Sequence, residues 1–264
     1  FIHDVYHKQE FLNKNPILKS LILDSPNFLE ECKGVIPKNK IWAHISGTDL
    51  IKDHTGKFYV LEDNLRVPSG VAYMLENRNV MKKVVTELFN NYKVSPVDDY
   101  TSQLYKCLSD ASYSKDKKKT IVILSPGIFN SAYFEHAYLA QQMGIDLVES
   151  SDLSLSDDNY VYMKTISGKK KIDVIYRRIN DDYLDPNVWI KDSTLGLPGL
   201  INSWKEKKIA IVNAPGSGVA DDKAVYAFVP KMIKFYLNET PKLAQVKTYL
   251  CAFNKEKKYV LDNM

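Results

Sequence analysis

The region from Thr120 to Val212 alternates between short apolar runs and helical patterns, and this alternation limits the fold more than any other feature. Four apolar runs have the length of strands, at residues 120–124, 145–149, 172–176 and 209–212. Helical patterns lie between them at 132–143, closed by Gly144, and near 197–205. Continuous apolar runs are typical of strands that are buried on both faces. The sequence therefore predicts an α/β fold with an open, mostly parallel sheet, whose ligands lie beyond the carboxyl ends of the strands.

The residues before this region follow a different order of elements. The patterns predict a helical segment at 1–30, a strand at 41–45 and a hairpin of 48–53 with 57–62. A helix is predicted roughly from Val71 to Tyr92. Further along the chain, a second hairpin is predicted around residues 167–168. Pro96 and the polar stretch 109–119 indicate a boundary. We therefore expect one part at 1–117, helical with a hairpin, and an α/β domain at 118–264.

Composition excludes several classes of protein. The 264 residues are 45% apolar and 26% charged, as in an ordinary globular protein. The net charge is only +4, and no aromatic residues interleave the lysine clusters, so nucleic acid is not an expected partner. No apolar run has the length of a membrane span, and no signal peptide is visible. Cys32, Cys107 and Cys251 fit neither a disulfide framework nor a zinc site, which favours a cytoplasmic location. The start at Phe1, without a methionine, suggests that an N-terminal piece is missing.

Arginine is rare, since only four of the 36 basic residues are arginine: Arg66, Arg78, Arg177 and Arg178. A chain that otherwise uses lysine keeps arginine where a rigid, bidentate group is needed. The alternative is that one or two of these residues form buried or interface ion pairs.

The hairpin carries the most chemistry. Glu62, Asn64 and Arg66 are two residues apart and share one face of a strand, which suits a metal ion and a phosphate. Asp49 on the partner strand is a candidate for the second carboxylate. A three-residue turn at 54–56 sets Asp49 opposite Leu61, and one extra residue, most naturally a bulge at Gly56, brings it onto the face of Glu62. The alternative is an exposed edge with surface charges.

The stretch from Glu62-Asp-Asn64-Leu-Arg66 to Val-Pro-Ser-Gly70 resembles the metal-binding hairpin of ATP-grasp ligases. Its early place in the chain resembles the circularly permuted ATP-grasp type 2 family, which includes glutathionylspermidine synthetase-like ligases. The resemblance implies that ATP and Mg²⁺ are bound, with Asp49, Glu62 and Asn64 as metal ligands. It also implies that Arg66 acts in catalysis near the transferred phosphate.

A second block, from Ser125 to His136, matches the same family. A strand that ends in Pro-Gly before a helix offers free backbone N–H groups to an anion. Asn130, Ser131, Glu135 and His136 are candidate substrate-binding residues, although Asn130 or Ser131 is equally suited to cap the helix, and a single histidine is more often a core residue. Ile128-Phe129 and Ser150-Ser151 stand where the family has Pro-Tyr and Gly-Arg, so substrate contacts are expected to differ.

The pair Arg177-Arg178 lies where a buried strand ends. Adjacent residues of a strand face opposite ways, so we expect one arginine to contact a carboxylate or acyl phosphate of the substrate and the other a structural partner. We favour Arg178 as the catalytic one, without excluding Arg177.

A third block runs from Asn213 to Lys223. Its Gly216-Ser-Gly218 pattern is typical of a phosphate loop but also of a plain turn before a helix with acidic capping. The resemblance implies that Asp222 and Lys223 contact the nucleotide, together with Gly216 and Gly218. It also implies that Asn213 lies by the substrate.

These blocks together predict an ATP-dependent carboxylate–amine ligase that acts through an acyl phosphate on small-molecule or peptide substrates. The family pattern also implies a nucleotide-binding lysine and a Gly-rich loop beyond Met264, so this chain is expected to hold only part of the ATP site. One alternative is a non-catalytic module that binds a nucleotide or peptide, and another is a different nucleotide-dependent α/β enzyme. The oligomeric state is left open.

Overall fold

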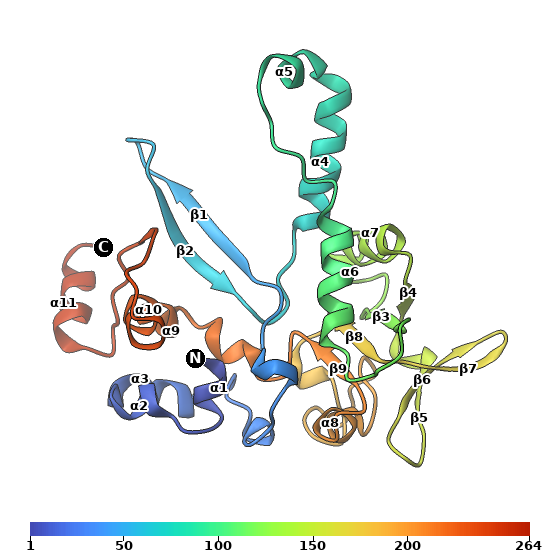
Figure 1. Ribbon diagram of the computed structural model, residues 1–264. Coiled ribbons are helices and arrows are strands. Elements are labelled where there is room, and N and C mark those ends of the chain that lie inside the picture. The colour runs from blue at the N-terminus through green and yellow to red at the C-terminus, as the bar shows by residue number, and fades with distance from the viewer. The chain divides into compact units, whose positions relative to one another are not determined.

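The computed structural model describes all residues, 1–264, and divides into two compact units (Figure 1). Unit 1 contains residues 1–36, 40–66 and 215–264, and unit 2 contains residues 37–39 and 67–214. The boundary expected between residues 117 and 118 is not a boundary of either unit. The two domains expected from the sequence remain a prediction.

A four-stranded parallel sheet forms the core of unit 2. Its order is β4-β3-β8-β9, with bounds Asp146–Val148, Ile121–Leu124, Val174–Arg177 and Ala210–Val212. Every residue of β3, β8 and β9 is buried. The helices of this region are α6 (Tyr100–Ala111), α7 (Tyr133–Met143) and α8 (Leu200–Lys205). The predicted α/β fold with a parallel sheet is confirmed, because apolar runs with no polar face can only be interior strands.

Unit 2 also contains a small antiparallel sheet. Its strands are β5 (Leu153–Leu155), β6 (Val161–Thr165) and β7 (Gly168–Lys171), so the second predicted hairpin is confirmed. Short 3₁₀ helices, η3 (Ser150–Asp152) and η4 (Asp181–Tyr183), follow β4 and β8.

The long helix predicted from Val71 to Tyr92 was wrong in its extent. It forms two helices, α4 (Val71–Val84) and α5 (Thr86–Asn91), because Val85 leaves the helical region with φ −121° and ψ 46°.

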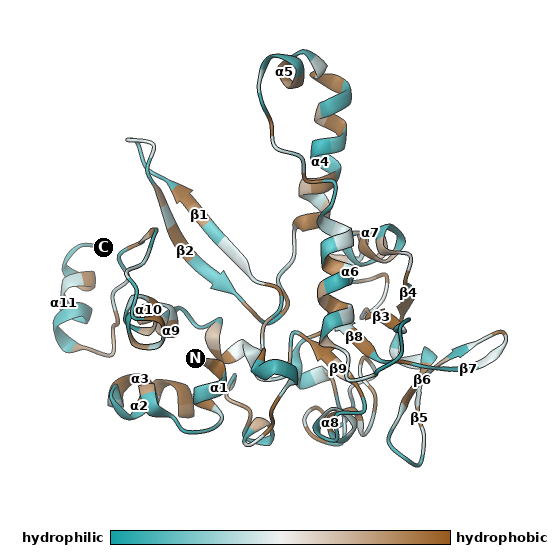
Figure 2. Cartoon of the chain, viewed as in Figure 1, coloured by the Kyte–Doolittle hydropathy of each residue, from teal (hydrophilic) through white to brown (hydrophobic).

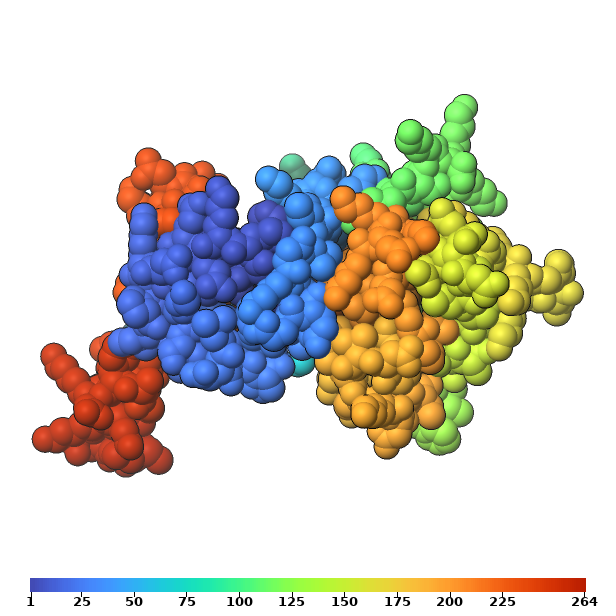
Figure 3. Space-filling view, turned by 90° about the horizontal axis from the view of Figure 1, so that it is seen from below, coloured from blue at the N-terminus to red at the C-terminus, as the bar shows by residue number.

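Unit 1 joins the two ends of the sequence. Its short helices are α1 (Ile2–Val5), α2 (Glu10–Asn13), α3 (Pro16–Leu23), η1 (Glu30–Cys32), η5 (Ser217–Ala220), α9 (Lys223–Tyr226), α10 (Val229–Leu237) and α11 (Asn254–Asp262), with η2 (Lys38–Lys40) at the limit between the units. Figure 3 shows the N-terminal segments, in blue, against C-terminal segments in orange and red. Phe11 packs on Phe235 at 5.3 Å between ring centroids, and Tyr236 donates a hydrogen bond to Asp4.

The hairpin of unit 1 consists of β1 (Gly47–Lys52) and β2 (Phe58–Asn64). The short strand β10 (Ala244–Gln245) pairs in parallel with β2, which makes β2 the central strand. Figure 2 shows apolar residues toward the turn end of β2 and polar residues toward its other end. The strand predicted at residues 41–45 was wrong, since this segment is irregular and Trp42 is buried there. Apolar side chains that are buried by packing do not require a strand partner.

Every helix is too short or too polar to cross a membrane. All three cysteines are free, with Cys32 buried and Cys251 exposed.

Candidate functional site

Asp49 and Glu62 lie directly opposite each other on β1 and β2. The turn closes with a hydrogen bond of 3.0 Å from the N–H of Asp53 to the carbonyl of Lys57, as the three-residue loop predicts. The register then shifts between Asp49 and Leu50, because Leu50 pairs with Val60 and leaves Leu61 as the extra residue. The predicted bulge is therefore present, but at Leu61 rather than at Gly56.

The side chains around this pair separate onto two faces. Thr48 donates a hydrogen bond of 2.6 Å to Asp63, and both alternate in sequence with Asp49 and Glu62. Asn64 follows Glu62 by two residues, and its amide nitrogen donates to the carbonyl of Gly47 at 3.4 Å. The amide oxygen of Asn64 is thus free of that hydrogen bond. The hairpin groups two carboxylates and one amide, which are ligands of hard cations.

No three histidine, cysteine or acidic side chains converge to hold a metal ion by themselves. A cation on Asp49, Glu62 and Asn64 must therefore take further ligands from water or from a phosphate. Lys223 is a positively charged residue of the protein that lies beside these groups. Its ammonium nitrogen lies 3.3 Å from Oε2 of Glu62, with the lysine side chain 70% exposed. The ammonium thus lies beside the Glu62 carboxylate, and the oxygen atoms of Asp49, Glu62 and Asn64 are of the kind that Mg²⁺ takes as ligands.

The segment before Lys223 contacts the end of β2. Asp221 accepts hydrogen bonds from the backbone N–H groups of Leu65 and Arg66, at 2.5 and 3.1 Å, and lies 3.6 Å from Nε of Arg66. Asp222 caps α9 by accepting from the N–H of Ala224 at 2.7 Å, which is the capping alternative of the sequence analysis. Asp221 is not among the site residues predicted from the sequence. Because Asp222 caps α9, the neighbouring Asp221 was a signal that a second acid has a different partner.

The glycines of the same loop are set by packing. Gly216 has φ +85°, and its carbonyl accepts a hydrogen bond of 3.1 Å from the hydroxyl of Tyr6. A Cβ at Gly216 would lie 2.7 Å from that hydroxyl oxygen and 3.0 Å from the sulfur of Cys32. Gly218 lies within η5 and is buried. These contacts explain Gly216 without a phosphate, and a nucleotide role for Gly216 and Gly218 remains a prediction.

Glu135 and Arg178 form a buried ion pair in unit 2, with Oε1 and Nη2 2.7 Å apart. Oε2 of Glu135 accepts from the N–H groups of Gly70 and Ala72 at 2.7 and 3.0 Å, which caps the start of α4. Nη1 of Arg178 donates to the carbonyl of Pro68 at 2.7 Å and to the hydroxyl of Tyr176 at 2.9 Å. The pair therefore fixes the segment that follows the hairpin motif in sequence.

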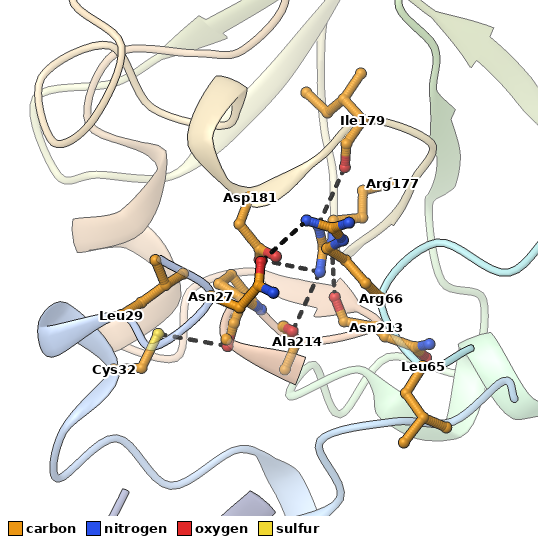
Figure 4. A network of polar contacts seen from close by, with 12 residues as sticks. Asn27, Leu29, Cys32, Leu65, Arg66, Arg177, Ile179, Asp181, Asn213 and Ala214 are labelled. Atoms are coloured by element: carbon orange, nitrogen blue, oxygen red, sulfur yellow. Dashed lines mark hydrogen bonds and ion pairs between the residues drawn. The ribbon is translucent and has the colours of Figure 1, made fainter. Parts of the chain in front are cut away.

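Arg177 is also fully buried, with 1% of its surface exposed (Figure 4). Its Nε donates to the carbonyl of Asn213 at 2.7 Å, and Nη2 lies 3.0 Å from the carboxylate of Asp181. Nη1 donates to the carbonyl of Ile179 at 3.1 Å. Asn213 itself is 2% exposed. Both arginines thus bind protein groups at the carboxyl end of β8, and neither presents an open guanidinium.

His136 lies beside the end of β3. Its Nδ1 is 2.9 Å from the hydroxyl oxygen of Ser125, which accepts from the N–H of Gly127 at 3.1 Å. Burial, with a smaller effect of the positive charge of Arg178, lowers the pKa of His136 to about 4. The imidazole is therefore neutral at pH 7 and serves as a hydrogen-bonding core residue.

The loop after β3 is open to solvent. Asn130 accepts from the N–H of Ala132 at 2.9 Å, so it forms a local turn before α7. Ser131 is exposed, and Phe129 is 98% exposed. Of the predicted residues of this block, Asn130 and Ser131 are thus accessible to a ligand, whereas Glu135 and His136 are not.

The comparison with protein families agrees with the hairpin and the parallel sheet. The model of the circularly permuted ATP-grasp type 2 family matches residues 1–264, the whole chain. The chain belongs to this family. An uncharacterized protein of Synechocystis sp. is 47% identical over 264 residues, which are 100% of this chain and 55% of that protein. An uncharacterized protein of Mycobacterium tuberculosis is 46% identical over 264 residues, 100% of this chain and 48% of that protein.

A protein of Frankia casuarinae that carries the provisional name of a glutamate–cysteine ligase is 36% identical to this ATP-grasp chain over 265 residues. The match covers 100% of this chain and 30% of that protein. The chain spans about half the length of the first two relatives.

Proposed function

We propose that the protein containing this ATP-grasp chain is an ATP-dependent carboxylate–amine ligase. The observation that supports it most is the pairing of Asp49 with Glu62 on the hairpin, with Asn64 next on the same face and Lys223 3.3 Å from Glu62. Two carboxylates, one amide and one exposed ammonium form a set of groups that suits a metal-bound triphosphate.

The family resemblance implies the class of reaction. A substrate carboxylate oxygen attacks the terminal phosphorus of ATP, the bond to the β-phosphate oxygen breaks, and ADP leaves. An amine then attacks the acyl phosphate, loses a proton and displaces phosphate, which forms an amide. Asp49, Glu62 and Asn64 would hold Mg²⁺, which when bound neutralises charge on the phosphates. Arg66 and Lys223 would contact the phosphate that is transferred.

The residues of unit 2 would serve the substrates. We propose that Asn130, Ser131 and Asn213 contact a substrate, as the family resemblance implies. Glu135, His136, Arg177 and Arg178 would support that surface from below, since they bind protein groups at the ends of β3 and β8.

Glutamate and cysteine are the first substrates to test. The relative from Frankia casuarinae carries the name of a ligase for these two amino acids, with the chain matching 30% of its length. Both supply what the proposed reaction requires, a carboxylate and an amine.

The first test is thermal unfolding of the full-length protein with and without Mg²⁺-ATP. A ligand at a hundred times its dissociation constant stabilises the folded state by about 2.7 kcal/mol. The shift should disappear in Glu62→Ala, Asn64→Ala and remain in Glu206→Ala, which removes a surface carboxylate that pairs with Lys208 in unit 2.

A second test separates a ligase from a binding module. Hydroxylamine converts an acyl phosphate to a hydroxamate, so incubation with Mg²⁺-ATP and each of the common amino acids should release ADP and hydroxamate together. Nucleotide binding without ADP release for any acid would favour the non-catalytic module. No binding at any Mg²⁺ concentration would reject the ligase.

A further inference from the structure

Asp221 makes several contacts to the two residues that follow β2, Leu65 and Arg66. Its Oδ1 accepts from two successive backbone N–H groups, of Leu65 at 2.5 Å and Arg66 at 3.1 Å. Its Oδ2 lies 3.6 Å from Nε of Arg66, and the aspartate side chain is 17% exposed. One carboxylate thus binds both the backbone and the side chain of the same arginine.

These contacts matter because β2 ends at Asn64. Beyond that residue, no ladder hydrogen bonds fix the chain, and the two N–H groups need another acceptor. A charged acceptor forms stronger hydrogen bonds than a neutral one. Asp221 therefore fixes the direction in which the chain leaves the strand that carries Glu62 and Asn64.

The ion pair also orients the guanidinium. Asp221 lies beside Nε of Arg66, which leaves the end of the planar group, with Nη1 and Nη2, for another ligand. Of these, Nη1 makes only a long contact of 3.5 Å with the side-chain oxygen of Asn27. The Arg66 side chain as a whole is 32% exposed. A fixed guanidinium loses less conformational entropy when it binds a phosphate.

The same segment anchors β2 at two more points. Lys223 reaches Glu62 at 3.3 Å, and the hydroxyl of Tyr226 donates to the carbonyl of Val60 at 2.7 Å. Asp222, by contrast, only caps α9. The loop from Asp221 to Tyr226 thus brings one arginine, one lysine and the metal-binding hairpin into a fixed arrangement.

We infer that Asp221 is a positioning residue, which aims Arg66 at the phosphate that the protein transfers. This inference rests on the proposed function, because it assigns Arg66 a phosphate as its ligand. Both oxygens of Asp221 face Leu65 and Arg66, so we assign it no contact of its own with the nucleotide.

The test measures the affinity of the full-length protein for a non-hydrolysable β,γ-imido analogue of ATP with Mg²⁺, and for adenosine, by calorimetry. Asp221→Ala should weaken binding of the analogue about tenfold or more. It should leave adenosine binding unchanged, because adenosine has no phosphate. The double variant Asp221→Ala, Arg66→Ala should bind no more weakly than Arg66→Ala alone, since Asp221 acts through Arg66.

Asp4 offers a matched control in unit 1. Its carboxylate also accepts from two backbone N–H groups, of Glu10 and Phe11, both at 2.8 Å. Asp4→Ala should lower stability through lost hydrogen bonds and leave the affinity for the analogue unchanged. Asp221→Asn keeps an acceptor for the two N–H groups, so it should restore stability but only part of the affinity.

Amide hydrogen exchange tests the contacts without any nucleotide. The N–H groups of Leu65 and Arg66 should exchange faster in Asp221→Ala and stay protected in Asp4→Ala. Unprotected amides in the wild-type protein would overturn the positioning role while leaving the ligase proposal intact. Additive losses in the double variant, or an equal loss of adenosine binding, would overturn it as well. A wild-type protein that binds no analogue would reject the ligase and the positioning role together.

Discussion

Oε1 of Glu135 and Nη2 of Arg178 lie 2.7 Å apart inside unit 2, where both side chains are buried. The same carboxylate caps α4, and the same guanidinium binds the carbonyl of Pro68. Two residues that the sequence suggests for substrate binding and catalysis thus hold a backbone segment in place. A buried pair of this kind is costly to break, because the remaining charge has no partner.

Glu135→Ala should therefore lower the free energy of unfolding by about 3–5 kcal/mol. The loss arises from the uncompensated charge of Arg178 and from the uncapped N–H groups of Gly70 and Ala72. Urea unfolding measures it. Glu206→Ala, which breaks the exposed pair with Lys208 at 2.7 Å, should leave stability nearly unchanged. Equal effects of the two changes would contradict a special role for burial.

Lys223→Met should raise the affinity for a divalent cation in the absence of nucleotide, because it removes the ammonium that competes for Glu62. Mn²⁺ titrated into the protein and followed by electron paramagnetic resonance gives the free cation directly. The same variant should weaken binding of the ATP analogue, since it loses a positive charge near phosphate. Lys52→Met is the control on the same hairpin, where the lysine lies over the ring of Phe58. An unchanged Mn²⁺ affinity in Lys223→Met would argue against a metal at Glu62.

Gly216→Ala should destabilise the protein by about 3 kcal/mol or more, through a left-handed backbone and overpacking against Tyr6 and Cys32. Gly34→Ala separates the two causes, because Gly34 has φ +74° but no atom within 4 Å of its Cβ position. Its cost should be about 1–2 kcal/mol, from the backbone alone. Thermal unfolding compares them, and similar losses for both would show that the space around Gly216 adapts.

His136 should make the stability of the protein depend on pH. Its folded pKa of about 4 lies below the ordinary value of 6.5, so the folded state binds fewer protons than the unfolded state between these values. The contribution is fully present above pH 6.5 and is lost as the pH falls toward 4, by about 3 kcal/mol in total. Urea unfolding at several pH values should show this loss in the wild-type protein.

The variant His136→Gln isolates that dependence. It should be less stable at pH 7, because it disturbs the hydrogen bond to Ser125, but its stability should fall less between pH 6.5 and 4. The same slope in both proteins would mean that other groups cause the pH dependence.

Much of the architecture could be predicted from local patterns. The four apolar runs became β3, β4, β8 and β9, and the turn around Gly56 closed the hairpin as its length requires. Only the interior of a sheet accommodates strands without a polar face, so these predictions needed no knowledge of distant contacts. The strand expected at residues 41–45 is absent, because Trp42 is buried by packing without pairing in a sheet and Ile41 is exposed.

The sequence by itself determined the α/β class, the hairpin and the family, because these depend on periodicity and on motifs within a few residues. The tertiary structure decided which groups meet. Asp221 binds residues that are 155 and 156 positions away, and Glu135 meets Arg178 across 43 positions. The bulge at Leu61 likewise depends on how β1 and β2 pair, since one extra residue fits at several points of a hairpin. Spacing along the chain carries no information on such contacts, which form only when packing brings the segments together.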